Sequence, residues 1–185
     1  GDINPVAWFV VKKEVEDIDP QVLTDALGRL DAELGEELRR YYWTTCPECG
    51  REAEGIYYFH CREIECPSCK AEVPLMRDFF LAKSVTGHGD TVVCPACWNV
   101  FETPRAGDCV TCPTCSETFV PRGTSSVKAG LFRCPKCHVE HRLSGRLRDA
   151  HQSYRTYAVE FYCEECDRRA NPQLKNGRGY KKADD

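Results

Sequence analysis

Six Cys-x-x-Cys pairs divide this chain of 185 residues and constrain its fold more strongly than any other feature of the sequence. A tetrahedral zinc site needs four thiolates, and two such pairs supply them when the chain between the pairs is long enough to turn back. Grouped in chain order, the pairs predict three tandem zinc ribbons, each holding one Zn²⁺ ion between two consecutive pairs. The predicted ligands are Cys46, Cys49, Cys66, Cys69, Cys94, Cys97, Cys112, Cys115, Cys134, Cys137, Cys163 and Cys166.

The first five pairs have a proline after the first cysteine, whereas the sixth reads CEEC. Two cysteines, Cys61 and Cys109, fall outside the pairs. Cys109 precedes Cys112 by three residues and offers an alternative pair with it, but the CPTC form of the Cys112 pair matches the other sites. We therefore expect Cys61 and Cys109 to be thiols without a function. Some histidines near the pairs are not needed to complete any set of four: His60, His138 and His141.

The composition makes metal the expected source of stability. Hydrophobic residues are 42% of the chain, but this count includes the 14 cysteines. A ribbon of about 30 residues buries too little surface to offset its chain entropy, whereas zinc contributes about 10–16 kcal/mol to the folding of finger-like peptides. A disulfide framework would suit a secreted chain, but we find no signal peptide and no apolar run long enough to span a membrane. We expect a reducing, cytoplasmic setting and no membrane partner.

The cysteines also indicate the organisation along the chain. Residues 1–43 contain none and are expected to be helical, because Asp19-Pro20 is a helix-start pair. Another such pair, Asn4-Pro5, opens an apolar stretch whose helical or extended character the pattern leaves open. Apolar side chains then recur at steps of three and four, namely Leu23, Leu27, Leu30, Leu34, Leu38 and Tyr41. The expected fold is small, metal-stapled and mainly β, with a helical segment at 1–43, ribbons at 44–89, 90–127 and 128–170, and a flexible tail at 171–185.

Charge is distributed unevenly over this order. The net charge is −4, yet residues 122–182 carry 14 basic and 6 acidic side chains, a local net charge of +8. Guanidinium groups bind phosphate and aromatic rings stack on bases, so this basic and aromatic region indicates nucleic acid as a partner. The alternative is that these basic residues form only a solvated charged surface and bind no nucleic acid. The candidate DNA-binding residues are Arg142, Arg146, Arg148, Arg155, Arg168 and Arg169.

Several segments resemble the adenine-specific DNA methylases that carry an inserted zinc-ribbon region. The matching text is GDINPVAWFVVKKEV, RRYYWTTCPECGREAEGIYYF, CPSCKAEVPLMRDFFLAKS, GLFRCPKCHVEHRL and YAVEFYCEEC. The resemblance implies that GDINP ends a strand of the methyltransferase sheet, that Asp2 binds the ribose of S-adenosylmethionine, and that Asn4-Pro5 opens a helix. The glycine-rich cofactor loop and the Asp-Pro-Pro-Tyr type catalytic motif of that family are absent.

These observations lead to one main hypothesis and two alternatives. We expect a zinc-ribbon module inserted in, or split from, an adenine-specific DNA methyltransferase. It would not be catalytic by itself and would help to engage DNA, the methyltransferase core or a partner subunit. One alternative is a protein-interaction scaffold with no nucleic-acid role. Tetrathiolate sites also hold iron, so the other alternative is an iron redox protein.

Overall fold

The computed structural model describes residues 4–83, 89–143 and 153–184 of the chain. These residues form two compact units, Gly1–Tyr41 and Tyr42–Asp185. We call them the helical unit and the β unit, and each is described by itself.

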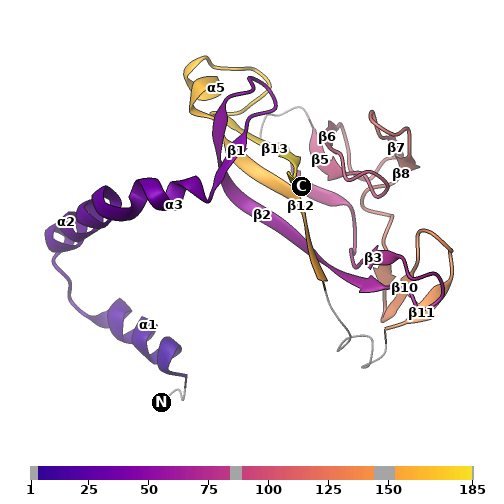
Figure 1. The fold of residues 1–185 in the computed structure, drawn as a ribbon, viewed down its shortest axis with the longest axis horizontal. Coiled ribbons are helices and arrows are strands. Elements are labelled where there is room, and N and C mark those ends of the chain that lie inside the picture. Colours follow the sequence, from indigo (N-terminus) through magenta and orange to yellow (C-terminus); the bar gives the residue numbers. More distant parts are fainter. Residues whose placement is uncertain (1–3, 84–88, 144–152, 185) are drawn as a thin grey trace. The chain divides into compact units, whose positions relative to one another are not determined.

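The helical unit confirms the expected N-terminal helical segment. The Asn4 side chain accepts a hydrogen bond from the Val6 amide (3.0 Å), and the Asp19 side chain accepts one from the Gln21 amide (2.8 Å). Each cap is followed by a proline at the first helical position, where its missing amide hydrogen costs nothing. The elements are α1 (Pro5–Val15), α2 (Pro20–Leu30), the π-helical turn η1 (Asp31–Gly35) and α3 (Glu36–Arg40) (Figure 1).

The π turn is closed by one ion pair. Arg39 Nη1 lies 2.9 Å from Asp31 Oδ1, eight residues earlier, and the pair passes over Gly35. A Cβ atom at Gly35 would lie 2.2 Å from Asp31 Oδ1, so glycine leaves the space that this pair fills. The apolar side chains of both long helices remain exposed, and Gly35 is the buried residue of the described part of this unit.

One sheet organises the β unit. Its strand order is β1-β2-β12-β13, with β3 also on β2, and all of these pairs are antiparallel. The long strands β2 and β12 lie side by side although about half of the chain separates them (Figure 1). The strands are β1 (Trp43–Thr45), β2 (Glu52–Glu65), β3 (Glu72–Pro74), β12 (Ser153–Tyr162) and β13 (Arg178–Lys182).

Smaller sheets occupy the chain between β3 and β12. One has the order β4-β5-β6, a second pairs β7 with β8, and a third has the order β11-β10-β9. A short helix, α5 (Glu164–Arg168), follows β12. The strands are β4 (Phe80–Lys83), β5 (Asp90–Val93), β6 (Val100–Thr103), β7 (Val110–Thr111), β8 (Thr118–Phe119), β9 (Val127–Lys128), β10 (Leu131–Arg133) and β11 (Glu140–Arg142).

The C-terminal segment differs from the expected flexible tail. β13 pairs with β12 along its whole length, and Gly179 lies against Leu174 and Phe161, where a Cβ would be too close. Lys181 then bonds to Asp184, whose carboxylate accepts a hydrogen bond from Thr44 Oγ1 (2.6 Å). The segment is ordered by these tertiary contacts, which lack a periodic sequence signature.

The hydrophobic core of the β unit is divided into three clusters, and each contains paired cysteines. One groups Phe161 and Leu174 with Cys46, Cys163 and Cys166, and another groups Ile64, Val73 and Phe132 with Cys66 and Cys134. The third surrounds Cys94 and Cys112 with apolar residues that include Phe79, Val92 and Phe119. No described helix is long and apolar enough to cross a membrane.

Candidate metal centres

The paired cysteines gather into three groups of four, as expected in number, but two of the three groupings differ from the chain order. The expected combination of Cys94, Cys97, Cys112 and Cys115 is confirmed. The other two groups combine the first expected ribbon with the third. They are Cys46, Cys49, Cys163 and Cys166 (the outer site) and Cys66, Cys69, Cys134 and Cys137 (the middle site), with the confirmed group as the inner site.

The length of β2 explains the correction. The 14 residues of this strand separate Cys49 from Cys66, and an extended strand of that length spans about 48 Å. Cys49 and Cys66 therefore cannot share an ion. Antiparallel pairing with β12 brings Cys163, which follows β12, to the end of β2 that carries Cys49. The prediction that the first two Cys-x-x-Cys pairs share one site was wrong. The segment IYYFHCREIE between them contains no Pro, Asn or Gly at which the chain would turn back.

The sulfur atoms are spaced for tetrahedral coordination. Opposing Sγ atoms lie 3.8 and 3.5 Å apart in the outer site, 3.7 and 3.5 Å in the middle site, and 3.5 and 3.7 Å in the inner site. A Zn–S bond of 2.3 Å in a tetrahedron gives an S–S edge of about 3.8 Å. All 14 cysteines are free of disulfide bonds. The donor set and the spacing therefore fit one metal ion in each group.

Five of the six Cys-x-x-Cys turns share one backbone conformation. In each, the residue four positions after the first cysteine donates its amide hydrogen to the carbonyl of that cysteine, at 2.9–3.0 Å. This residue has a positive φ in every case, a conformation that favours glycine, and glycine occupies it in the first turn only. The residues are Gly50, Lys70, Trp98, Ser116 and His138.

The sixth turn, CEEC, folds differently. Cys163 starts the short helix α5, and the Asp167 amide donates to the Cys163 carbonyl at 3.0 Å. The Cys163 amide donates to the carbonyl of Gly177 at 2.8 Å, which ties the turn to the segment before β13. The one pair without a proline is thus the one that continues into a helix.

Two thiols of the inner site differ strongly in acidity. In the inner site, burial raises the pKa of Cys94 to about 12. Burial also disfavours the Cys112 thiolate, but hydrogen bonds from the backbone amides of Cys115 and Thr114 and from the Cys97 and Cys115 thiols together outweigh burial and lower the pKa of Cys112 to about 6. A metal ion must displace the protons of the weaker acids, so metal uptake is coupled to pH.

The middle site has a histidine beside its sulfur atoms. His141 Nε2 lies 3.4 Å from Cys66 Sγ and 3.3 Å from Ser68 Oγ, and its ring stacks on Phe132 with centroids 5.2 Å apart. Since four thiolates complete the group, His141 contacts a ligand atom and is not needed as a ligand. Sequence reasoning set this residue aside, and only the pairing of β11 with β10 brings it to the site.

A buried carboxylate in the CEEC turn engages two of the candidate DNA-binding residues. Glu165 is 7% exposed, and its carboxylate forms ion pairs with Arg168 (2.8 Å), Arg169 and Arg51 (3.6 Å). Arg51 follows the first Cys-x-x-Cys turn, so this network spans both halves of the outer site. Arg168 and Arg169 therefore have a role within the fold.

Arg155 is engaged in the same way. Arg155 Nε lies 2.5 Å from Glu63 Oε1, its Nη2 lies 3.6 Å from Glu72, and the guanidinium lies 5.4 Å from the Trp98 ring centre. Arg142 lies exposed on β11. Three further predicted site residues, Asp2, Arg146 and Arg148, fall outside the described residues.

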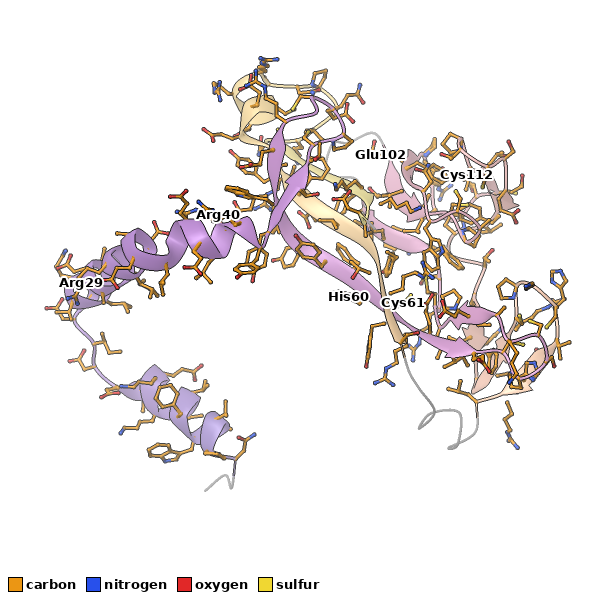
Figure 2. The ribbon with its side chains drawn as sticks, in the orientation of Figure 1. Arg29, Arg40, His60, Cys61, Glu102 and Cys112 are labelled. Carbon is orange, nitrogen blue, oxygen red and sulfur yellow. The ribbon has the colours of Figure 1, made fainter. Side chains whose placement is uncertain are left out.

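The two unpaired cysteines join none of the metal groups among the described residues. Cys61 is a buried residue of β2, and its neighbour His60 on the same strand is exposed (Figure 2). Burial, assisted by the charge of Glu63, raises the pKa of Cys61 to about 11. Cys109 is exposed.

Comparison of the chain with protein-family models, with curated proteins and with solved structures found no match. The resemblance to adenine-specific DNA methylases thus rests on the quoted sequence segments alone.

Proposed function

We propose that this protein is a non-catalytic binding module whose β unit is held together by three structural Zn²⁺ ions. The observation that carries the proposal is the set of three complete four-cysteine groups with sulfur spacings of 3.5–3.8 Å. A catalytic zinc keeps a position open for water, whereas four thiolates close the coordination shell. Each group also lies within a hydrophobic cluster, where an ion replaces a larger core.

Metal analysis tests this part of the proposal. The purified chain should contain three zinc ions and no colour. Replacement by Co²⁺ should give thiolate-to-metal charge-transfer bands of matching stoichiometry. A red protein containing iron would support the redox alternative instead, and fewer than three ions with a folded β unit would contradict the assignment.

We further propose that the module engages DNA as part of an adenine-specific DNA methyltransferase. The local net charge of +8 over residues 122–182 and the resemblance of the quoted segments support this role. A methyltransferase core would have to supply the chemistry and the remainder of the S-adenosylmethionine site, with Asp2 as the proposed ribose contact.

A titration with duplex DNA at two salt concentrations tests the DNA role. Phosphate contacts should make the affinity fall steeply as salt rises, because neutralised phosphates release counterions. The informative variant combines Arg142→Glu, Arg146→Glu and Arg148→Glu, because Arg155, Arg168 and Arg169 are bound to carboxylates and their reversal would disturb the fold. Arg105→Glu, at an exposed residue outside the basic region, is the matched control. An equal loss of DNA affinity in both variants would contradict the DNA role, and so would the absence of DNA binding by the unmodified chain at low salt.

The second candidate function is a protein-interaction scaffold. The ion pairs of Arg155, Arg168 and Arg169 with buried glutamates favour this function, because they reduce the positive charge that is available to bind phosphate. The triple reversal distinguishes the two functions, because partner binding by a scaffold should be indifferent to it.

A further inference from the structure

One edge of β2 is open between two short strands. β12 pairs with β2 along its other edge, from Glu54 to Glu63. On the open edge, β1 pairs with residues 52–54 and β3 with residues 63–65 (Figure 1). Two further backbone bonds, from Gly55 to Tyr42 and from Leu75 to Arg62, close the two ends. No described strand pairs with this edge from Ile56 to Cys61.

The open edge has backbone groups to offer. The Arg62 carbonyl faces this edge, because it accepts the Leu75 amide at 2.7 Å. Amide and carbonyl groups of alternate strand residues face the same side. The register shift of β2 lies between Gly55 and Tyr57, so the alternation from Arg62 is unbroken as far as Tyr58, and the groups of His60 and Tyr58 also face the open edge. Unpaired backbone groups on a strand are a ready template for another strand.

We propose that this edge binds a short extended peptide segment of a partner protein, which adds a strand to the sheet between β1 and β3. Main-chain hydrogen bonds would provide the affinity, as in other cases of strand addition. The six residues of the gap span about 20 Å and accommodate a segment of similar length. This inference does not depend on the DNA role proposed above.

The recess of the edge excludes a second copy of this chain as the occupant. In each copy, β1 and β3 extend one strand width, about 4.8 Å, beyond the open residues of β2. Two recessed edges cannot approach each other to hydrogen-bonding distance while both copies keep β1 and β3. A free segment without flanking strands can enter.

The surroundings of the edge indicate the chemistry of the segment. A hollow of about 330 Å³ near β3 is lined by His60, Arg62, Arg77 and Asp78 among others, and the Asp78 carboxylate already accepts the Phe80 amide. This end therefore favours an acidic side chain. A second hollow, of about 460 Å³, lies at the β1 end and is lined by Tyr42, Ile56 and Tyr162 together with Glu54 and Arg178. The two rings and the Ile56 side chain can contact an apolar side chain of the segment at this end.

The polarity of the segment follows from its neighbours. β1 and β3 are both antiparallel to β2. A bound segment that runs in the same direction as β1 and β3 has its N-terminus beside Arg62. The fitting probe is acetyl-Asp-Asp-Val-Thr-Val-Thr-Val-amide, with its acidic residues at the N-terminal end.

Hydrogen exchange on the zinc-loaded full chain tests whether the edge is open. The Tyr58 and His60 amides should exchange at least 100-fold faster than those of Tyr57 and Phe59, which face β12. Slow exchange at all four residues would mean that another part of the chain covers the edge, and the proposal would be wrong.

Titration of the probe, followed by amide NMR shifts, tests binding. The amide signals of Tyr58 and His60 should shift. Two further probes carry N-methyl groups at alternate amides. Methylation of the amides that face β2 should weaken binding at least tenfold, and methylation of the amides that face away should weaken it less than twofold. Arg77→Glu should weaken binding about fivefold, and Arg105→Glu should not. Absence of binding at millimolar probe, equal effects of both methylated sets, or displacement of the probe from these amides by oligothymidylate would overturn the proposal.

Discussion

The Sγ atoms of Cys46 and Cys166 lie 3.8 Å apart, although 120 residues separate them in the chain. The outer site thus encloses the middle site, in which Cys66 and Cys137 are 71 residues apart, and the middle site encloses the inner site, where Cys94 and Cys115 are 21 apart. The three sites are nested in the sequence. The strand β2 joins the cysteine pairs of the outer and middle sites, whereas the cysteines of the inner site lie outside β2 and β12.

Nesting predicts that the two long-range sites are coupled and the inner site is independent. Closing the loop of 120 residues costs about 1.5 kcal/mol more than closing the loop of 21. Cys166→Ser should remove the outer ion and make the middle site more sensitive to a chelator, because β2 joins the cysteine pairs of both sites. Cys115→Ser should remove one ion and leave the other two unchanged. Native mass spectrometry during chelator titration measures both, and equal sensitivity of all sites in Cys166→Ser would contradict the coupling.

His141 is expected to tune the middle site. Its ring contacts both Cys66 and Ser68, and loss of such an outer contact typically weakens metal binding 10- to 100-fold. His141→Ala should therefore lower zinc affinity at this site alone, by about tenfold. His138→Ala provides the control, because His138 follows the same Cys137 turn and is exposed. Competition with a chromophoric chelator gives the affinities, and identical values for the two variants would leave His141 without this role.

The two glutamates of the CEEC turn should differ strongly in their effect on stability. Glu165 is buried among three arginines, whereas its neighbour Glu164 is exposed. Glu165→Gln should lower the free energy of unfolding by about 1–3 kcal/mol, because it breaks charge-assisted hydrogen bonds at a buried group. Glu164→Gln should change it by less than about 0.5 kcal/mol. Urea unfolding of the zinc-loaded protein compares the two, and similar losses would show that the network is not stabilising.

The positive φ shared by five Cys-x-x-Cys turns predicts that removing a glycine there lowers the stability of the protein and that introducing one raises it. A Cβ at Gly50 would meet no atom within 4 Å, so Gly50→Ala should be destabilising by about 1 kcal/mol through the backbone conformation alone. Ser116→Gly should be stabilising by up to about 1 kcal/mol, because glycine adopts this conformation without strain. Thermal unfolding at fixed zinc concentration tests both predictions: the melting temperature should fall in Gly50→Ala and rise in Ser116→Gly.

The unpaired cysteines should differ in reactivity. The pKa of Cys61 is raised to about 11, so its thiol remains protonated at pH 8, while Cys109 is exposed. Iodoacetamide should label Cys109 and spare Cys61 in the zinc-loaded protein, as peptide mass spectrometry can show. The folded pKa lies above the unfolded value of 9.0, so this thiol contributes stability below pH 9 that is lost as pH rises toward 11. Cys61→Ala should remove that part of the alkaline loss of stability.

The sequence was sufficient to predict which cysteines gather in groups, because Cys-x-x-Cys is a local pattern, and the helix start at Asp19 was predictable for the same reason. At Asn4-Pro5 the local pattern left helix and strand open. Which cysteines gather in the outer group depends on the pairing of Tyr58 with Val159 and its neighbours, and nothing local to either strand specifies that pairing. The arginines illustrate the same limit. Arg155 was a candidate DNA contact until β2 brought Glu63 to 2.5 Å from it.

The bond between Thr44 and Asp184 joins β1 to a residue just after β13, although β2 and β12 lie between these two strands in the sheet. β1 leads directly into Cys46 of the outer site. A mechanical force applied between Tyr42 and Asp184 would therefore act on the outer site first and peel β1 and β13 from the sheet. The middle site would carry load only after the outer site ruptures, and the inner site would be last. Pulling on single molecules should thus show three successive ruptures, in an order set by the nesting of the cysteines.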